Sequence, residues 1–256
     1  MHFDTPDTRN LPLKAEQKIR LVRFLELIGD YLRDGHAQQH GAYTGMDDPV
    51  PVLPVAETLP RADSLEVLEA EVRECQACPL GRNRIKAVPG EGVLRPLVLV
   101  IGEGPGAEED ASGRPFVGRA GQLLDRMLDA VGLSREQNCF IANVVKCRPP
   151  NNRDPQPEEI AACAPFLARQ LAILKPRMIL CAGRVAAQTL LHTSEGIGRL
   201  RGQVTEYQDL PLLATYHPSA ILRDESLKRP AWEDLKALRA RLAVLDAGYA
   251  RDQGEA

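Results

Sequence analysis

The feature that most constrains the fold is a regular alternation of short apolar runs with helical patterns between residues 95 and 245. The apolar runs have the length of strands and cover residues 95–103, 139–145, 177–183 and 211–218. Helical patterns follow them at 120–131, 156–174, 184–191 and 229–245. Continuously apolar strands that alternate with helices are typical of a parallel or mixed sheet covered on both faces. We therefore predict an α/β fold around a mostly parallel, four-stranded sheet, with functional loops at the carboxyl ends of the strands.

An N-terminal extension precedes this alternating region. Residues 13–34 have apolar side chains at helical spacing and predict one amphipathic helix. The residues that follow contain Gly and Pro throughout and predict a flexible linker. Ser64 has the character of an N-cap and begins a new helix that leads to Cys75. We expect the extension at 1–62, one globular domain at 63–247 and a C-terminal tail at 248–256.

Bulk composition excludes several classes of protein. The net charge of −3 is not that of a protein that coats nucleic acid by bulk electrostatics. No apolar run approaches the roughly 20 residues that span a bilayer, and the first residues lack the pattern of a signal peptide. We expect a monomeric, cytoplasmic protein without membrane contact, in which the six cysteines stay reduced.

The spacing of the cysteines suggests a metal centre. Cys75 and Cys78 form a C-x-x-C pair, Cys147 follows the second apolar run, and Cys163 lies in the next helical pattern. Thiolates from a tight pair and two distant segments can converge on zinc or on an iron–sulfur cluster, and the spacing does not distinguish the two. The alternative for each is a buried thiol that acts as a small hydrophobic side chain. We expect that second role for the two cysteines inside apolar runs.

The loop after the first apolar run contains several candidate site residues. Gly102, Gly104 and Gly106 permit a ligand to approach the backbone closely. Glu103 is an acid at a strand end, a position suited to general acid–base chemistry. The loop matches neither the phosphate-loop pattern nor the dinucleotide-binding pattern. Phe116 lies in a loop rather than in a periodic segment, which suits stacking on a flat base.

Four segments together resemble the motifs of a known family. GEGPGAEED, GRPFVGRAGQLL, NVVKCRPPNNRDP and YHPSAILR occur in this order and are similar to motifs of the iron–sulfur (family 4) uracil-DNA glycosylases. The resemblance runs from about Ser64 to Leu245 and leaves out the N-terminal extension. It implies a three-layer α/β/α fold and a DNA-repair enzyme that flips uracil out of single- or double-stranded DNA and hydrolyses its N-glycosidic bond, which leaves an abasic site. It also implies a [4Fe–4S] cluster held by four residues: Cys75, Cys78, Cys147 and Cys163.

The same resemblance implies roles for individual residues of a uracil pocket. The amide of Asn143 would pair with O4 and N3–H of uracil, a combination that cytosine mismatches. His217 would donate a hydrogen bond to O2, where negative charge develops as uracil leaves. Phe116 would stack on the flipped base. By position, Ile221 would push into the gap in the duplex, with Leu222 as the competing wedge. Further DNA contacts are expected from four residues: Gly118, Arg119, Ser219 and Arg223.

One departure limits the mechanism that the resemblance implies. Many uracil glycosylases carry an aspartate in the first motif to position the attacking water, and the corresponding residue here is Gly104. Catalysis would then rest on His217 and on an oxocarbenium-like sugar stabilised by phosphates. Glu103, the nearest acid, either handles the attacking water or shapes the pocket.

Several alternative functions fit parts of the sequence. Related enzymes that bond covalently to the abasic sugar carry an inserted KRRIH loop, whereas residues 146–159 here contain no histidine. A glycosylase that also accepts hypoxanthine or damaged pyrimidines fits equally, because the pocket width is not legible from sequence. A damage-binding scaffold with an inactive site conflicts with the presence of both Asn143 and His217. The N-terminal helix would dock a replication or repair protein or pack on its own domain.

Overall fold

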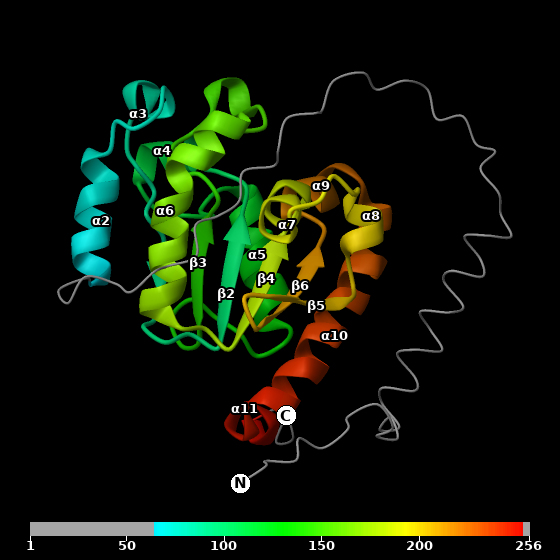
Figure 1. Cartoon of the computed structure of the whole chain (residues 1–256). Helices are drawn as coiled ribbons and strands as arrows, with labels where there is room; N and C mark the ends of the chain where they lie inside the picture. Colours follow the sequence, from blue (N-terminus) through cyan, green and yellow to red (C-terminus); the bar gives the residue numbers. More distant parts are fainter. Residues whose placement is uncertain (1–63, 253–256) are drawn as a thin grey trace, which may run out of the picture. The chain divides into compact units, whose positions relative to one another are not determined.

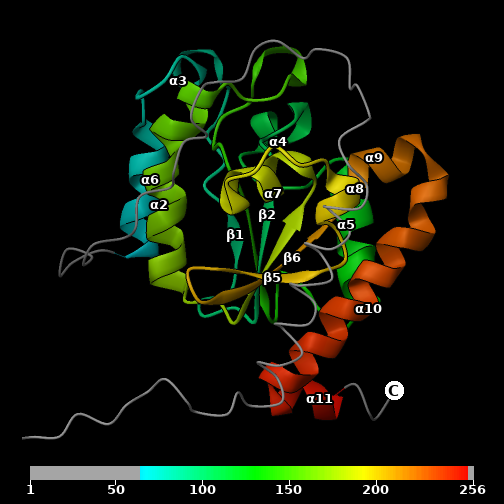
Figure 2. The same ribbon diagram turned by 45° about the vertical axis from the view of Figure 1, so that its right-hand side comes forward.

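The computed structural model of the chain describes residues 64–252 (Figure 1). The helix predicted at 13–34, the linker after it and residues 253–256 lie outside that range. Within the described part, helices lie on both faces of a central sheet (Figures 1 and 2). The predicted three-layer α/β/α architecture is therefore confirmed.

The four predicted strands form the centre of the sheet and are parallel. In spatial order they are β3 (Cys139–Asn143), β2 (Val98–Gly102), β4 (Met178–Ala182) and β6 (Leu210–Thr215). All residues of the first three are buried, which is why these segments are apolar without interruption. The parallel centre of the sheet is as the sequence predicts.

The prediction of a four-stranded sheet misses two antiparallel edge strands, so the sheet has six strands. β1 (Glu91–Gly92) pairs with β3 and is only two residues long, too short to show a period in sequence. β5 (Val204–Tyr207) forms a hairpin with β6. The hairpin turns at Gln208 and Asp209, which have φ of 48° and 64°. Asn-Gly or Asp-Gly would have revealed such a turn, but Gln-Asp does not.

The helices begin and end close to the predicted bounds. Ser64 caps α2, because its Oγ accepts the N–H of Val67 at 3.3 Å. The long helices are α2 (Leu65–Glu74), α5 (Arg119–Asp129), α6 (Pro157–Leu174), α7 (Arg184–Leu191) and α10 (Lys228–Leu245). The short ones are α3 (Leu80–Asn83), α4 (Ala107–Ser112), α8 (Ile197–Leu200), α9 (Pro218–Arg223) and α11 (Ala247–Asp252).

Helix α11 lies where the sequence predicts a tail from residue 248. Tyr249 in this helix is buried, and its hydroxyl donates to the carbonyl of Val131 at 2.5 Å. A single aromatic anchor of this kind leaves no periodic signal, so a short helix is mistaken for a tail. No helix in residues 64–252 is both long and apolar enough to cross a membrane.

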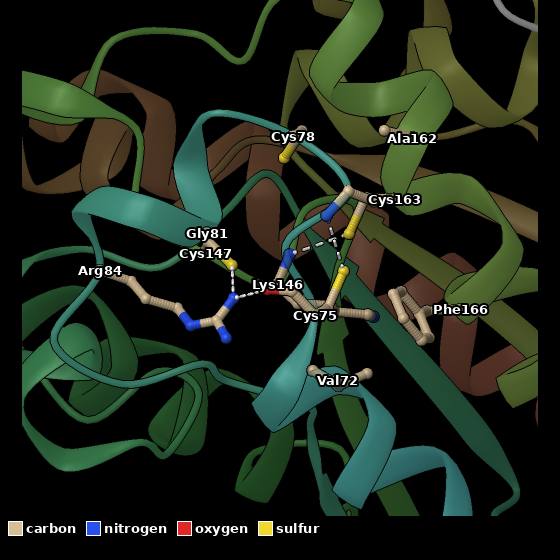
Figure 3. A pocket seen from close by; sticks show the side chains of 11 residues that line it. Val72, Cys75, Cys78, Gly81, Arg84, Lys146, Cys147, Ala162, Cys163 and Phe166 are labelled. Carbon is tan, nitrogen blue, oxygen red and sulfur yellow. Dashed lines mark hydrogen bonds between the residues drawn. The ribbon is translucent and has the colours of Figure 1, made fainter.

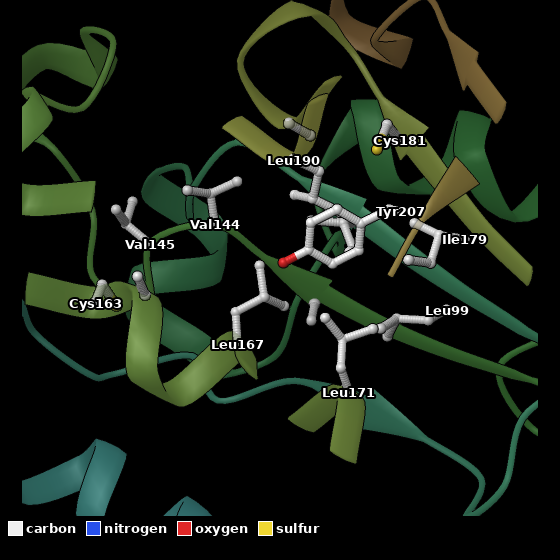
Figure 4. Close-up of a cluster of buried hydrophobic side chains, with 14 of the residues drawn as sticks. Leu99, Val144, Val145, Cys163, Leu167, Leu171, Ile179, Cys181, Leu190 and Tyr207 are labelled. Atoms are coloured by element: carbon white, nitrogen blue, oxygen red, sulfur yellow. The ribbon is translucent and has the colours of Figure 1, made fainter. Parts of the chain in front are cut away.

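Alternate strand residues pack against opposite helical layers. Leu99 and Ile101 of β2 belong to a core shared with α2, α6 and α7, whereas Val98 and Val100 belong to a core shared with α5 and α10. Figure 4 shows the first of these cores, with the Tyr207 ring of β5 among the aliphatic side chains. Because the four central strands are parallel, their carboxyl ends lie at one edge of the sheet. The loops that follow them therefore meet there.

Candidate active site and cysteine cavity

A pocket of about 670 Å³ lies at the carboxyl ends of the parallel strands. The loops after β2, β3, β4 and β6 all contribute to its wall. Most of the residues predicted from sequence for the uracil pocket and the DNA contacts line it: Glu103, Gly104, Gly106, Phe116, Gly118, Arg119, Asn143, His217, Ser219 and Arg223. Residues up to 120 positions apart in the chain thus share one cavity, hereafter the pocket.

Gly102, the last residue of β2, contacts the two pocket residues beside it. A Cβ atom on Gly102 would lie 2.5 Å from Oδ1 of Asn143 and 2.5 Å from Cζ of Phe116. Both distances are far below van der Waals contact. Glycine is therefore required here because the amide and the ring close over its Cα atom.

Asn143 presents an unpaired acceptor at the end of β3. The residue is 1% exposed, and its Oδ1 is one of two buried side-chain polar atoms in residues 64–252 that have no hydrogen-bond partner. A buried polar atom without a partner costs about 1–3 kcal/mol. Because Asn143 lines the pocket, a ligand with an N–H group would satisfy this atom.

His217 is a neutral imidazole with a defined tautomer. Its Nδ1 accepts the backbone N–H of Ser219 at 3.1 Å and lies 2.8 Å from Oγ of the same residue. Since Nδ1 is an acceptor, the ring proton is on Nε2. Burial, and secondly the charge of Arg223, lower the pKa of His217 to about 4. Gly183, with φ of 104°, makes room for the ring, because a Cβ there would lie 2.8 Å from that of His217.

Phe116 forms a flat wall of the pocket beside His217. The two ring centroids are 5.6 Å apart, with an angle of 33° between the ring planes. Phe116 is 6% exposed, and its φ of 51° places it in the left-handed region that residues other than glycine seldom adopt. The position of the aromatic ring therefore depends on a strained backbone conformation at Phe116.

Glu103 is one of the acids that line the pocket, and its environment disfavours ionisation. Burial, and secondly the nearby charge of Asp154, raise the pKa of Glu103 to about 7, whereas the charge of Arg184 acts to lower it. Asp154 and Arg184 form an ion pair and line the same pocket. A carboxyl group with a pKa near neutrality can exchange protons at physiological pH.

Sequence reasoning did not single out several pocket residues. Gly183 and Arg184 follow β4, and Tyr216 follows β6. The strand-end rule would have found these three, because they stand directly after predicted strands. Asp154 reaches the pocket from the loop before α6; it lies within the NVVKCRPPNNRDP segment, but that resemblance gave it no role.

The predicted wedge Ile221 is buried in this structure, whereas the competing wedge Leu222 is exposed. Ile221 is 2% exposed, whereas Leu222 is 40% exposed and lines the pocket. The reason is that residues 218–223 form the short helix α9, which turns Ile221 inward and Leu222 outward. The backbone N–H of Gly118, a residue expected to contact DNA, donates to Oε1 of Glu109 at 2.9 Å.

A second, smaller cavity, hereafter the cysteine cavity, is lined by all four cysteines that the sequence singles out as ligands (Figure 3). Cys75 ends α2, Cys78 precedes α3, Cys147 follows β3, and Cys163 lies on α6. The other two cysteines are fully buried within the strands, as expected of core residues. The fold therefore brings together the four thiols that are distant in sequence.

Three of these sulfur atoms receive N–H groups. The N–H of Ala77 lies 3.5 Å from Sγ of Cys75, and that of Lys146 lies 3.3 Å from Sγ of Cys163. The guanidinium of Arg84 donates to Sγ of Cys147 at 3.2 Å. Such contacts to sulfur are typical of ligating thiolates, whose negative charge they stabilise.

The donor set suits an iron–sulfur cluster. Burial raises the pKa of Cys163 to about 11 and raises that of Cys147, so thiolates here need a compensating positive centre. In residues 64–252, no group of three or more His, Cys, Asp or Glu is close enough to hold a single metal ion. Four thiols around one cavity are a donor set of the kind that an iron–sulfur cluster or zinc requires.

Lys146 connects the two cavities. Its backbone N–H faces Cys163, while its Nζ donates to the carbonyl of Asn143 at 2.8 Å and to Oε1 of Gln170 at 2.6 Å. The side chain is 1% exposed. A buried cation therefore holds the end of β3 that carries the pocket amide.

Comparison with known proteins points to one family. The family model of the uracil DNA glycosylase superfamily matches residues 89–236. This range includes all four parallel strands and the pocket. It begins after the C-x-x-C pair, which lies at 75–78.

Comparison with individual relatives distinguishes between types of uracil-DNA glycosylase. The chain is 44% identical to a type-4 uracil-DNA glycosylase of Pyrobaculum aerophilum over 67% of this chain and 91% of the relative. It is 43% identical to the type-4 uracil-DNA glycosylase of Thermotoga maritima, over 70% and 95%. A type-5 uracil-DNA glycosylase of Pyrobaculum aerophilum is 32% identical over 53% of this chain and 67% of the relative. The similarity to these type-4 proteins is thus both higher and more extensive.

Proposed function

The chain belongs to the uracil DNA glycosylase superfamily, and on this premise we propose that it removes uracil from DNA as a DNA-repair enzyme, as the names of its type-4 relatives indicate. The reaction is hydrolysis of the N-glycosidic bond between uracil and deoxyribose, and it leaves an abasic site. A base inside a duplex is out of reach, so the nucleotide must first be flipped into the pocket.

The unpaired Oδ1 of Asn143 is the observation that carries this proposal. Uracil offers an N–H donor at N3 next to the O4 acceptor, so one amide can accept from N3–H and donate to O4. Cytosine has an acceptor at N3 and a donor at C4, and would leave both atoms of the amide mismatched. Phe116, in contact with the same Gly102, supplies the face on which the base stacks.

We assign His217 the stabilisation of the leaving group. As the C1′–N1 bond breaks, its electron pair moves to uracil, and negative charge develops on O2. Nε2–H of the neutral imidazole donates a hydrogen bond to that oxygen. Removing one donor of this kind typically costs about a hundredfold to a thousandfold in rate. The low pKa of His217 keeps the ring neutral, so the ring donates without transferring its proton.

We assign Glu103 the role of orienting and deprotonating the water that attacks C1′. Gly104 takes the place of the aspartate common in other uracil glycosylases, and a Cβ there would lie 2.8 Å from Cγ2 of Val145, so little room exists for a longer side chain. The ionised Glu103 would orient the water and take its proton as oxygen bonds to C1′. Positive charge on the sugar is offset by the DNA phosphates.

We further propose that Leu222, rather than Ile221, enters the gap left by the flipped base, because it is the exposed apolar side chain of α9. Arg223, Arg119 and Ser219 stand at the pocket and would contact the sugar–phosphate backbone. Apolar wedges beside phosphate-binding residues commonly hold a kinked duplex open.

A [4Fe–4S] cluster would be held by the four thiolates of the cysteine cavity. When bound, it supplies four iron–sulfur bonds that tie the segments before α3, after β3 and within α6 together. Arg84 and the N–H groups of Ala77 and Lys146 would stabilise the thiolate charge. We propose that this role is structural.

The remaining assignments concern the whole chain. We propose a monomeric, cytoplasmic protein whose domain at 63–247 acts on DNA. A role for residues 1–62 in docking a replication or repair protein lies outside the described residues and stays a prediction.

An oligonucleotide assay tests the proposed function. Single- and double-stranded substrates carry uracil, a thymine mismatch or hypoxanthine, and alkaline cleavage reports abasic sites. We expect release of uracil without added divalent metal and at least a hundredfold slower release of the other bases, on the order of the discrimination that buried hydrogen bonds provide. Equal rates on hypoxanthine would widen the substrate class, and no uracil release would refute the proposal.

A further inference from the structure

Arg135 is a buried cation that belongs to none of the motifs and does not line the pocket. It stands between α5 and β3 and is 7% exposed. Its Nη1 donates to the carbonyl of Pro115 at 2.9 Å, and its Nη2 donates to the carbonyl of Phe116 at 3.0 Å. The guanidinium therefore binds two consecutive carbonyls of the turn that carries the aromatic wall of the pocket.

The conformation of Phe116 needs such support. A non-glycine residue in the left-handed region costs on the order of 1–3 kcal/mol, and persists where the surrounding structure over-determines it. The φ of 51° at Phe116 directs the ring to Gly102, whose hypothetical Cβ would lie only 2.5 Å from Cζ of the ring. A relaxed backbone at this residue would move the ring away from His217.

The turn around Phe116 is held from several sides. The N–H groups of Val117 and Gly118 both donate to Oε1 of Glu109 at 2.9 Å. Gly121 lies against the carbonyl of Phe116, because a Cβ on it would be 1.9 Å from that oxygen. Of these groups, Arg135 is the one that binds the carbonyl of the strained residue itself.

Carboxylates in turn hold Arg135. Oδ1 of Asp125 accepts from Nε at 3.1 Å and from Nη2 at 2.7 Å, and Oε1 of Glu91 lies 3.7 Å from Nη1. The planar guanidinium thus donates at the same time to the carboxylate of Asp125 and to the carbonyls of the Phe116 turn. A lysine would keep the charge but could not reproduce this geometry.

We propose that Arg135 is a positioning residue of the uracil pocket, which holds Phe116 in its left-handed conformation so that the ring stands beside His217 to receive the base. This inference rests on the proposed function for its catalytic consequence. Its structural content, the position of the Phe116 ring, stands apart from any activity.

Kinetics on three variants form the first part of the test. Arg135→Met should lower the single-turnover rate of uracil excision about tenfold to a hundredfold, the range expected when a reacting group is displaced by about 1 Å. Arg135→Lys should lie between that variant and the wild type. The affinity of both for abasic duplex should stay within about twofold of wild type.

Arg177→Met is the matched control, because it also removes one arginine, at a position directly before β4 that does not line the pocket. Arg177 is exposed and contacts Leu245 and Asp246, and its loss should leave the excision rate unchanged. An equal loss of rate in this variant would assign the effect to net charge and overturn the inference.

A double-mutant cycle asks whether Arg135 acts through the ring. Phe116→Ala alone should lower the rate, and adding Arg135→Met to it should cause no more than about a twofold further loss, because the ring to be positioned is gone. Losses that multiply would show that Arg135 acts elsewhere and would contradict the proposal.

The ring position itself is read by ¹⁹F NMR of protein labelled with 4-fluorophenylalanine. The chain has five phenylalanines, and the resonance absent from Phe116→Leu belongs to Phe116. We expect that resonance to shift or broaden in Arg135→Met, to recover partly in Arg135→Lys and to be unchanged in Arg177→Met. An unchanged resonance in Arg135→Met would overturn the inference.

Two further controls keep the outcomes distinguishable. If wild-type protein releases no uracil, the proposed function fails, while the ¹⁹F spectrum still decides the role of Arg135. If Arg135→Met does not fold, Arg135→Lys and Gly121→Ala take its place, since the methyl group added at Gly121 would displace the Phe116 carbonyl that Arg135 binds. A Phe116 resonance unchanged in both would contradict the proposal.

Discussion

In the pocket, Oδ1 of Asn143 is buried without a hydrogen-bond partner and Phe116 is held in a left-handed conformation. In the cysteine cavity, by contrast, three of the four sulfur atoms already receive N–H groups. The pocket therefore keeps a hydrogen-bond acceptor free for a ligand, as expected of a site whose ligand enters and leaves. The cysteine cavity arranges its donors around thiols, as a site does whose occupant stays and contributes to folding.

The two regions also differ in how they depend on the sheet. The strand ends of β2, β3, β4 and β6 and the segments that follow them supply most of the pocket wall, so its geometry depends on the parallel register. The cysteine cavity is lined mainly by α2, α3, α6 and the segments beside them, and by Lys146 and Cys147 after β3. Only Lys146 contacts both through hydrogen bonds in the described residues. Changes in one region should therefore act on catalysis, and changes in the other on stability.

The largest expected effect is on catalysis in the pocket. Asn143→Ala and His217→Ala should each lower the rate of uracil excision about a hundredfold to a thousandfold, because each removes a hydrogen bond to the departing base. Abasic-DNA binding and the melting temperature should change little. His192→Ala, at the exposed end of α7, is the control. Near wild-type rates in both pocket variants would place the active site elsewhere.

The next effect is on stability in the cysteine cavity. Wild-type protein should be brown from its cluster, and Cys147→Ala should be colourless and melt about 10–20 °C lower, as expected for a loss of roughly 5 kcal/mol in a domain of this size. Calorimetry and the visible spectrum measure both quantities. Cys139→Ala, in the core of β3, should stay brown. A colourless, zinc-loaded and fully active wild type would refute the cluster.

Lys146→Met should affect both regions, and so lower both stability and catalysis. Methionine has similar length but leaves the Asn143 carbonyl and Oε1 of Gln170 without their buried donor, at about 1–3 kcal/mol each. We expect both a lower melting temperature and an excision rate reduced about tenfold. A change in only one of the two quantities would show that this residue does not couple the cavities.

The pH dependence of excision tests Glu103. Because a carboxyl group is uncharged below its pKa, and that of Glu103 is about 7, activity should rise with pH and reach its plateau above neutrality. At about pH 6 the rate should be roughly a tenth of the plateau. His217, with a pKa of about 4, stays neutral throughout. Glu103→Gln should flatten the profile, and an unchanged profile would leave Glu103 only a shaping role.

The smallest catalytic effect concerns α9. Leu222→Ala should lower excision from double-stranded DNA about threefold to tenfold and spare single-stranded DNA, since a wedge matters only where bases are stacked. Ile221→Ala should act instead on folding, by about 2–5 kcal/mol, because that side chain is buried. If Ile221→Ala proved to be the variant with the duplex-specific loss, α9 would have to rearrange on DNA.

Local patterns in the sequence are enough to predict the central sheet and most of the pocket. Uninterrupted apolar runs mark buried parallel strands, and residues directly after them must lie at one edge. Asn143 and His217 could therefore be predicted as site candidates, and the same rule would have found Gly183 and Arg184. Cys163 was placed with the C-x-x-C pair by its resemblance to a family pattern, because no local pattern predicts where a helix face will lie in space.

The sequence by itself determined the order of strands and helices and which residues stand at strand ends, because burial on both faces imposes a continuous apolar character. Only the tertiary structure decided the edge strands, the inward turn of Ile221 and the contact of Arg135 with Phe116. The physical reason is that these features depend on hydrogen bonds and packing between segments distant in the chain. Neither side-chain direction at the end of a short helix nor a buried guanidinium that binds two carbonyls has a period in the sequence.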